Sequence, residues 1–187
     1  MREIIVVAGP TAVGKTKYAI ALAKAFDGEI VSCDSMQLYK YMNIGSAKPT
    51  DAERAEAVHH LVDEIDPKEP FSVAKYSKMA KEAIEDIFSR GKTPIVSGGT
   101  GLYLNSLLYD MDFSNAPKDD ELRETLEKEA ELFGPEYIYN KLCEMDPETA
   151  KRIHPNNVKK VIRALEGASS GSSITDFKNC TKKCTDY

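Results

Sequence analysis

The chain of 187 residues is long enough for one medium domain, or for a small α/β core with an appended piece. Its composition, with 42% hydrophobic and 29% charged residues, is that of an ordinary soluble globular protein. No apolar run approaches the roughly 18 residues that span a bilayer, so no membrane association is expected. The formal net charge of −5 argues against a general nucleic-acid coat, and any contact with RNA would need a local concentration of basic residues.

The amino-terminal stretch and the cysteines both indicate a cytoplasmic protein. Residues 2–8 run directly into a glycine motif instead of a small-residue cleavage site, so they are expected to form structure and not a signal peptide. Without a secretory signal, the four cysteines are expected to be reduced thiols. Cys180 and Cys184 resemble half of a zinc site, but no second pair accompanies them, which disfavours a structural metal.

The first 110 residues alternate between strand and helix patterns. We predict strands, helices and one polar, loop-like stretch in this order: strand 3–8, helix 15–26, strand 29–33, loop 35–57, strand 60–65, helix 71–88 and strand 92–97. Strands that alternate with helices indicate βαβ units, and therefore a parallel sheet with helices on both faces.

The pattern changes after about residue 113. Residues 118–133 are acidic and rich in helix formers, and two or three short helical patterns follow without any strand signal. Residues 167–173 contain only Gly, Ala and Ser, which is typical of a flexible connection. We therefore predict an α/β core at 1–113 and a mainly helical subdomain with a flexible end at 114–187.

The segment Gly9-Pro-Thr-Ala-Val-Gly14-Lys15-Thr16 fits the P-loop pattern G-x-x-x-x-G-K-[ST], between a predicted strand and a predicted helix. In such a loop, backbone N–H groups and the helix N-terminus bind phosphate, the lysine adds a positive charge, and the threonine hydroxyl can bind Mg²⁺. The predicted phosphate-binding residues are Gly9, Thr11, Ala12, Val13, Gly14, Lys15 and Thr16, with Thr16 also the metal ligand. The alternative is a helix start with an incidental lysine and threonine. Kinases, NTPases and some transferases all use a P-loop.

Asp34 follows the second predicted strand, at the carboxyl edge where open α/β sheets bind ligands. A carboxylate beside a phosphate site would repel the ligand unless it binds metal or accepts a proton. We favour a general base that takes a proton from an attacking amine or hydroxyl. The alternative is an aspartate that only caps a turn.

Several longer segments closely resemble successive signatures of the tRNA dimethylallyltransferases. They occur in the family's order, and the resemblance covers nearly the whole chain. The segments are Asp34-Ser-Met-Gln-Leu-Tyr39, Asn43-Ile-Gly-Ser-Ala-Lys-Pro49, His59-His-Leu-Val-Asp63, Gly98-Gly-Thr-Gly-Leu-Tyr103, Arg152-Ile-His-Pro-Asn156 and Arg163-Ala-Leu-Glu166.

The resemblance implies a P-loop NTPase-like core that binds dimethylallyl diphosphate. The N6 amine of the adenine next to the tRNA anticodon would attack the allylic carbon, and Mg²⁺ would neutralise the leaving diphosphate. Lys15, Asp34 and Thr100 match the positions of catalytic groups, with Asp34 as the base. The positions that match tRNA contacts around the core are Asp34, Ser35, Met36, Gln37 and Thr100. Thr100 is also a plausible N-cap of a helix.

The basic segment between Glu148 and Glu166 supplies the local positive charge that an RNA-binding role requires. Asn156 or Asn157 can cap a helix here, with Val158, Val161, Ile162 and Leu165 directed inward and the basic side chains on its open side. The resemblance assigns tRNA contact to Arg123 and to a segment of this helix: Lys159, Lys160, Val161, Ile162 and Arg163. The alternative is a solvated basic helix face.

The chain departs from the family pattern in three places. Lys160 replaces a usual arginine, Ser46 replaces a usual threonine, and the chain stops near the point where the family continues with another core strand and further helices. We therefore expect a sheet that lacks one strand. The alternative functions are an adenylate isopentenyltransferase, a P-loop small-molecule kinase and an inactive binding module. No stable protein partner is predicted.

Overall fold

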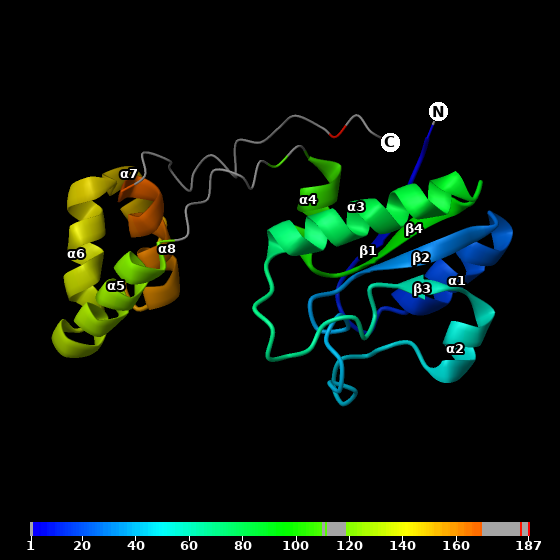
Figure 1. Ribbon diagram of the computed structural model, residues 1–187, viewed down its shortest axis with the longest axis horizontal. Helices are drawn as coiled ribbons and strands as arrows, with labels where there is room; N and C mark the ends of the chain where they lie inside the picture. Colours follow the sequence, from blue (N-terminus) through cyan, green and yellow to red (C-terminus); the bar gives the residue numbers. More distant parts are fainter. Residues whose placement is uncertain (1, 110, 112–118, 170–183, 185–186) are drawn as a thin grey trace. The chain divides into compact units, whose positions relative to one another are not determined.

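The computed structural model describes residues 2–109, 111, 119–169, 184 and 187. The chain forms two compact units, one of Met1–Asp110 with Lys182–Tyr187 and the other of Met111–Thr181. The first unit is an α/β sheet domain and the second is helical (Figure 1). The predicted fold class, a parallel sheet flanked by helices with a mainly helical addition, is confirmed.

The sheet has four parallel strands in the order β1-β4-β2-β3. The strands are β1 (Ile5–Ala8), β2 (Gly28–Cys33), β3 (His59–His60) and β4 (Thr93–Gly98). In the centre of the sheet, Ile30 pairs with Ile95 and Val31 pairs with Val96. Because all strands run the same way, their carboxyl ends meet at one edge.

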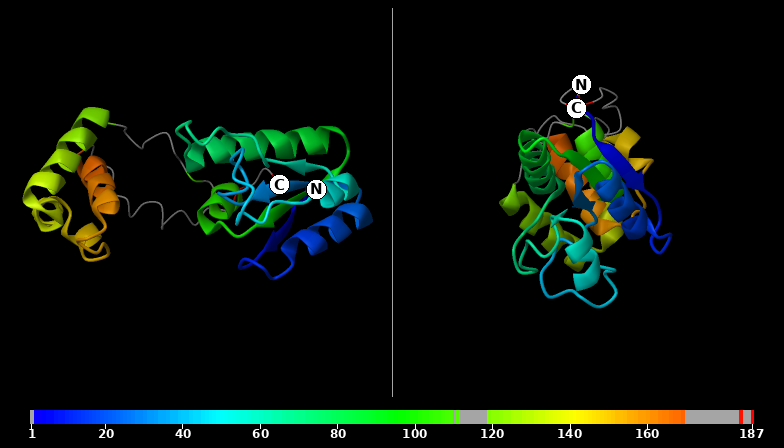
Figure 2. Two further views of the ribbon diagram at one scale, coloured as in Figure 1. Left: turned by 90° about the horizontal axis from the view of Figure 1, so that it is seen from below. Right: turned by 90° about the vertical axis from the view of Figure 1, so that its right-hand side faces the viewer.

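Helices cover both faces of the sheet (Figure 2). The alternation of side chains along β2 and β4 determines which helix packs on which face. Ile30 and Ile95 belong to a buried cluster with α1 (Lys15–Ala25). The next residues, Val31 and Val96, belong to a larger cluster with α3 (Val73–Ser89) and α4 (Gly101–Leu108) on the other face. Consecutive aliphatic residues in the middle of both strands are the sequence pattern of a sheet that is buried on both faces.

Two local predictions between residues 35 and 65 are wrong. The third strand ends at His60, because Leu61 and Asp63 have φ angles of 59° and 61°, which a β-strand does not allow. The stretch expected to be a loop contains α2 (Asp51–Glu56). Thr50 and Glu53 form a reciprocal capping box at its start, a signal that the sequence already carries as T-x-x-E.

The helical unit contains α5 (Asp120–Phe133), α6 (Pro135–Met145), α7 (Pro147–Ala150) and α8 (Val158–Ser169). The buried residues of its core include Leu126, Ile138, Leu142, Val161, Ile162 and Leu165. The amide of Lys160 donates to Asn157 Oδ1 at 3.4 Å, so Asn157 is the capping asparagine. The predicted flexible connection begins too early, since α8 continues through Gly167 to Ser169. The rest of that connection lies outside the described residues.

The end of the chain belongs to the first unit, although we assigned 114–187 to the helical subdomain. The Tyr187 hydroxyl donates to the carbonyl oxygen of Leu107 at 2.9 Å, and its side chain packs against the core beside α4. The amide of Cys184 donates to the carbonyl oxygen of Leu108 at 2.9 Å. Cys180 lies outside the described residues. None of the helices in the described part of the chain is long and apolar enough to cross a membrane.

A buried carboxylate forms ion pairs at the amino-terminal end of β2. The side chain of Glu29 is only 2% exposed, and Arg90, Lys92 and His60 all contact its oxygens. Arg90 Nη2 donates to Oε2 at 2.8 Å, and Lys92 Nζ lies 3.2 Å from Oε1. The hydrogen bonds from Arg90 lower the pKa of Glu29 to about 2, with help from His60 and Lys92 and against the opposing effect of burial.

We predict that Glu29 makes the fold acid-sensitive. The pKa of Glu29 is about 2 in the folded chain and 4.5 ordinarily, so its contribution to stability is present above pH 4.5 and is lost as the pH falls toward 2. Glu29→Gln should lower the free energy of unfolding at pH 7 by about 2 kcal/mol. This value is smaller than the full pKa shift implies, because the cationic partners are partly exposed to solvent. The difference from wild type should shrink below pH 4.5.

Urea unfolding between pH 7 and pH 3 measures this effect. Glu85→Gln is the matched control, because Glu85 pairs with Arg2 with both side chains about half exposed, and it should change stability little. A deficit in Glu29→Gln that stays constant down to pH 3 would contradict the assignment.

Candidate functional site

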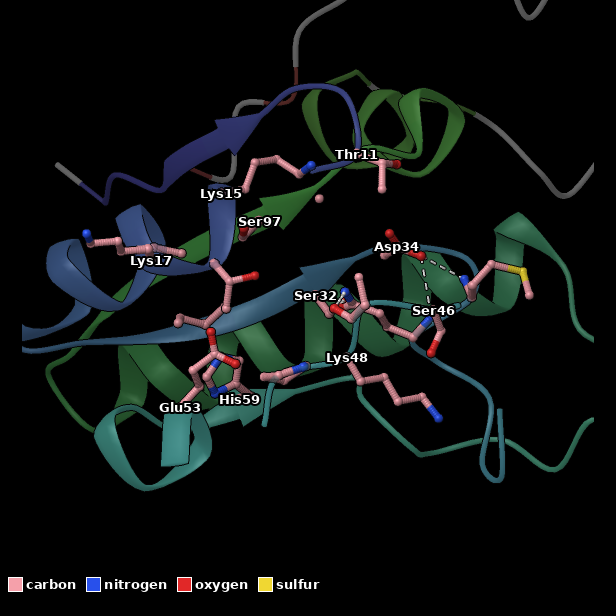
Figure 3. A pocket seen from close by; sticks show the side chains of 18 of the residues that line it. Thr11, Lys15, Lys17, Ser32, Asp34, Ser46, Lys48, Glu53, His59 and Ser97 are labelled. Atoms are coloured by element: carbon pink, nitrogen blue, oxygen red, sulfur yellow. Dashed lines mark hydrogen bonds between the residues drawn. The ribbon is translucent and has the colours of Figure 1, made fainter. Parts of the chain in front are cut away.

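The carboxyl ends of β1, β2 and β4 carry the three sequence motifs that we predicted to act together. The P-loop follows β1, Asp34 follows β2, and Gly98-Gly99-Thr100 lies between β4 and α4. A cavity of about 490 Å³ opens at this edge of the sheet (Figure 3). The predicted site residues that line it are Thr11, Ala12, Gly14, Lys15, Thr16, Asp34, Met36 and Gln37. Gly9, Val13, Ser35 and Thr100 are not among the lining residues.

The P-loop reaches its shape through two residues in the left-handed region, Ala12 (φ 67°) and Gly14 (φ 86°). Gly14 is the N-cap of α1 and makes no side-chain cap, so no side chain takes the place of an anion at the first N–H groups of the helix. Lys15 Nζ donates to the carbonyl oxygen of Pro10 at 2.6 Å, which holds the ammonium over the loop. The arrangement concentrates N–H donors and positive charge on one side of the cavity.

Asp34 lies across the cavity from Lys15 (Figure 3). Its Oδ1 accepts hydrogen bonds from the amides of Met36 (2.8 Å) and Gln37 (3.3 Å), so the turn itself fixes the carboxylate. Its Oδ2 accepts no hydrogen bond from the described residues. The turn-capping role and the proposed proton-accepting role therefore use different oxygens and are compatible.

The turns after β2 and β4 are joined directly. The hydroxyl of Thr100 accepts from the amide of Ser35 at 3.0 Å, and the amide of Thr100 donates to the carbonyl oxygen of Cys33 at 3.1 Å. Thr100 is the N-cap of α4, but its side chain bonds Ser35 and does not cap the helix. A Cβ on Gly98 would lie 2.0 Å from the carbonyl oxygen of Cys33, so only glycine permits this approach.

Cys33, the residue before Asp34, has a buried thiol. Burial raises its pKa to about 11, so it remains a neutral thiol and is not a reactive nucleophile.

Gln37 connects β2 to the loop that closes the cavity. Its Oε1 accepts from the Ser32 hydroxyl at 3.0 Å, and its Nε2 donates to the carbonyl oxygen of Ala47 at 2.7 Å. Met36, by contrast, is about half exposed at the cavity. Of the two, Met36 is free to contact a ligand, whereas Gln37 shapes the wall.

Sequence reasoning did not identify Lys48 as part of this site. Its side chain is 7% exposed, and its Nζ donates to Asp63 Oδ1 (2.6 Å), to the carbonyl oxygen of Tyr39 (2.7 Å) and to Asn43 Oδ1 (3.0 Å). Burial alone would raise the pKa of Asp63, but Lys48 and Arg54 outweigh it and lower that pKa. Lys48 is therefore a fixed anchor for the loop that carries Ala47.

His59 was also missed, and it lines the cavity beside Glu53 (Figure 3). Its Nδ1 lies 2.8 Å from the carbonyl oxygen of Ala57, so Nδ1 carries the proton and Nε2 is a bare acceptor. Burial is the main cause that lowers the pKa of His59, which keeps the ring neutral. The one sequence signal that pointed to His59 is its place in the family-like segment His59-His-Leu-Val-Asp63.

The cavity suits a magnesium ion that arrives with phosphate. Thr16 offers a hard oxygen ligand in the cavity, and Mg²⁺ commonly takes one or two protein oxygens and completes its shell with phosphate and water. Within the described residues there is no group of three or more His, Cys, Asp or Glu side chains that could hold a metal ion.

The predicted RNA-contacting residues of the helical unit divide into three kinds. Lys159 and Lys160 are exposed on α8. Arg123 and Arg163 both contact the buried carboxylate of Glu166. Val161 and Ile162 have buried side chains, with 0% and 3% exposure, inside the core of α5, α6 and α8. Their side chains hold α8 in place, so an RNA contact of these two residues would involve only their backbone.

Comparisons with known proteins identify the family of the chain. The family model for IPP transferase matches residues 37–187. The tRNA dimethylallyltransferase of Alkaliphilus metalliredigens is 54% identical over 187 residues, which are 100% of this chain and 60% of that relative. The chain thus spans less than two thirds of the length of such curated relatives.

Solved structures give the same result. The tRNA isopentenylpyrophosphate transferase of Bacillus halodurans is 42% identical with a TM-score of 0.61, over 93% of this chain and 57% of that chain. A eukaryotic dimethylallyltransferase acting on tRNA is 36% identical with a TM-score of 0.79, over 96% of this chain and 44% of that chain. With its P-loop, its Asp34 turn and a family match over most of its length, the chain belongs to the IPP transferase family.

Proposed function

We propose that this chain transfers a dimethylallyl group from dimethylallyl diphosphate to N6 of the adenine adjacent to the anticodon of a tRNA, in the cytoplasm. The observation that carries the proposal is that the P-loop and the Asp34 carboxylate line one cavity. A P-loop alone would suit many phosphate ligands, and a carboxylate beside it needs a proton-accepting or metal-binding task. The names of the relatives, which are tRNA dimethylallyltransferases, supply the substrate class.

The diphosphate of the donor binds at the amino-terminal end of α1. Backbone N–H groups of the P-loop and Lys15 surround its oxygens, where the helix N-terminus favours negative charge. Thr16 would hold a Mg²⁺ ion, which would supply charge neutralisation to the diphosphate. Holding this charge in place weakens the allylic C–O bond, because the electron pair of that bond leaves with the diphosphate.

The transfer itself needs one base. The lone pair of the adenine N6 forms a bond to the allylic carbon as the C–O bond to diphosphate breaks. The proton displaced from N6 passes to Asp34, whose Oδ2 is not committed within the described residues. Met36 lies half exposed at the same cavity and contacts the adenine ring of the tRNA. Thr100 acts through Ser35 and positions the turn that carries Asp34. Lys159 and Lys160 attract the RNA backbone.

We predict that Asp34→Asn lowers the kcat of prenyl transfer about 10²- to 10⁴-fold, the usual contribution of a general base. The asparagine oxygen can still accept from the amides of Met36 and Gln37, so the turn is retained while the basicity is lost. The measurement is mass spectrometry of nucleosides after incubation of the chain with dimethylallyl diphosphate, Mg²⁺ and unmodified tRNA.

Asp66→Asn is the matched control, because Asp66 Oδ1 caps a similar turn by accepting from the amide of Lys68 at 2.9 Å, away from the cavity lining. It should retain the wild-type rate. Full activity in Asp34→Asn would remove Asp34 as the base, and no prenylated adenosine from the wild-type chain would overturn the proposed function.

We also predict that Lys15→Ala weakens binding of inorganic diphosphate about 10- to 100-fold, the cost of losing a charge-assisted hydrogen bond. Titration calorimetry with Mg²⁺ present measures this without RNA or turnover. Lys24→Ala, in the last turn of the same helix, removes an equal charge and should bind diphosphate normally. Equal affinity of the Lys15 variant and wild type would show that the lysine does not contact the diphosphate.

A further inference from the structure

A buried carboxylate in the helical unit joins the two arginines that we expected to contact RNA. Glu166 lies on α8 with its side chain 1% exposed. Arg123 on α5 places Nη2 at 2.9 Å from Glu166 Oε2, and Arg163 on α8 places Nη1 at 3.4 Å from the same oxygen. The two guanidinium groups therefore come within a few ångströms of each other.

This arrangement of charges would stabilise the fold only weakly. Burying a carboxylate costs free energy that is recovered only when its oxygens are well paired. Here both arginines share Oε2, while Oε1 is buried and has no hydrogen-bond partner in the described part of the chain. A single bidentate arginine would satisfy both oxygens. Sharing one oxygen instead gathers two cations at one point.

Both arginine side chains remain accessible to solvent. The side chains of Arg123 and Arg163 are 35% and 40% exposed. Each guanidinium has five N–H donors, and Glu166 is the only hydrogen-bond acceptor for either within the described residues. Two guanidinium groups that share one carboxylate oxygen and have further N–H donors available suit a phosphate group, whose oxygens accept from several donors at once.

Net charge alone would not make this place attractive to RNA. Glu166 cancels one of the two positive charges, and Asp120 and Glu127 act electrostatically on Arg123 from its own helix. Lys159 and Lys160 are exposed on α8 and can attract RNA over a distance. The arginine pair must then contribute to RNA binding through the geometry of its N–H donors. The buried Glu166 carboxylate fixes that geometry.

We infer that Glu166 is a positioning residue that holds Arg123 and Arg163 as one binding site for a backbone phosphate of the RNA substrate. This inference rests on the proposed function, because it takes RNA as the ligand. It explains why an acid lies at the end of the basic segment: the acid fixes the direction in which the two arginines present their remaining donors.

The test uses the full chain, an anticodon stem-loop RNA and the variant Glu166→Gln. Glutamine keeps the size of the side chain and removes one negative charge, so the net charge of the unit becomes more positive by one. If charge alone mattered, the variant would bind RNA more tightly. We expect instead that it binds about 3- to 10-fold more weakly, and that the slope of log affinity against log salt falls by about one, as when a phosphate contact is lost.

Glu129→Gln is the matched control. It removes the same charge from the same unit and breaks the ion pair of Glu129 with Lys141, which are 2.6 Å apart. It should bind RNA as tightly as wild type or more tightly, with an unchanged salt slope. Circular dichroism on thermal unfolding shows whether each variant is folded.

Arg123→Lys keeps the inference testable if Glu166→Gln fails to fold. Lysine keeps the charge but lacks the planar guanidinium, so the RNA affinity of this variant should fall by a similar factor. If Glu166→Gln folds, the effects of the two substitutions should not add in the double variant. Wild-type affinity and salt slope in either single variant would overturn the inference alone. No RNA binding by the wild-type chain would overturn the proposed function together with it.

Discussion

The carboxyl ends of β2 and β4 approach each other more closely than a side chain would allow, and the candidate site depends on this approach. A Cβ at Gly98 would lie 2.0 Å from the carbonyl oxygen of Cys33, and a Cβ at Gly99 would lie 3.1 Å from that of Gly9. Above this contact, the Thr100 hydroxyl accepts from the amide of Ser35. The three strand ends are thereby held as one surface, with Asp34 facing the P-loop across the cavity.

The two ends of the sheet use charge in different ways. Where β2 begins, Glu29 is paired with Arg90, Lys92 and His60, so its charge is used for stability. Where β2 ends, Asp34 receives only backbone hydrogen bonds from the described residues and keeps one oxygen for chemistry. A short strand thus connects a structural carboxylate to the carboxylate that we propose as the base.

The sequence predicted the parts of the site that local pattern determines and missed those that depend on distant contacts. The P-loop and the Asp34 turn have local signatures and were found. The end of β3 was missed because Leu61 and Val62 are apolar residues typical of a strand. In the structure the Asp63 amide donates to the carbonyl oxygen of Gln37 and the Asp63 carboxylate pairs with Lys48, so the chain turns here. Likewise, nothing next to Lys48 in the sequence indicates that its ammonium is buried. The burial of Val161 and Ile162 followed from helical spacing, and it rules out side-chain contact with RNA.

The central claim is that the bond between the turns after β2 and β4 positions Asp34 for prenyl transfer. Comparison of Thr100→Val with Thr100→Ser tests it most directly, because valine keeps the shape of threonine and only serine keeps the hydroxyl. The account predicts that prenyl transfer slows at least about tenfold in Thr100→Val and recovers in Thr100→Ser, with diphosphate affinity unchanged in both. Wild-type transfer by Thr100→Val would contradict it, because Asp34 would then be positioned without that bond.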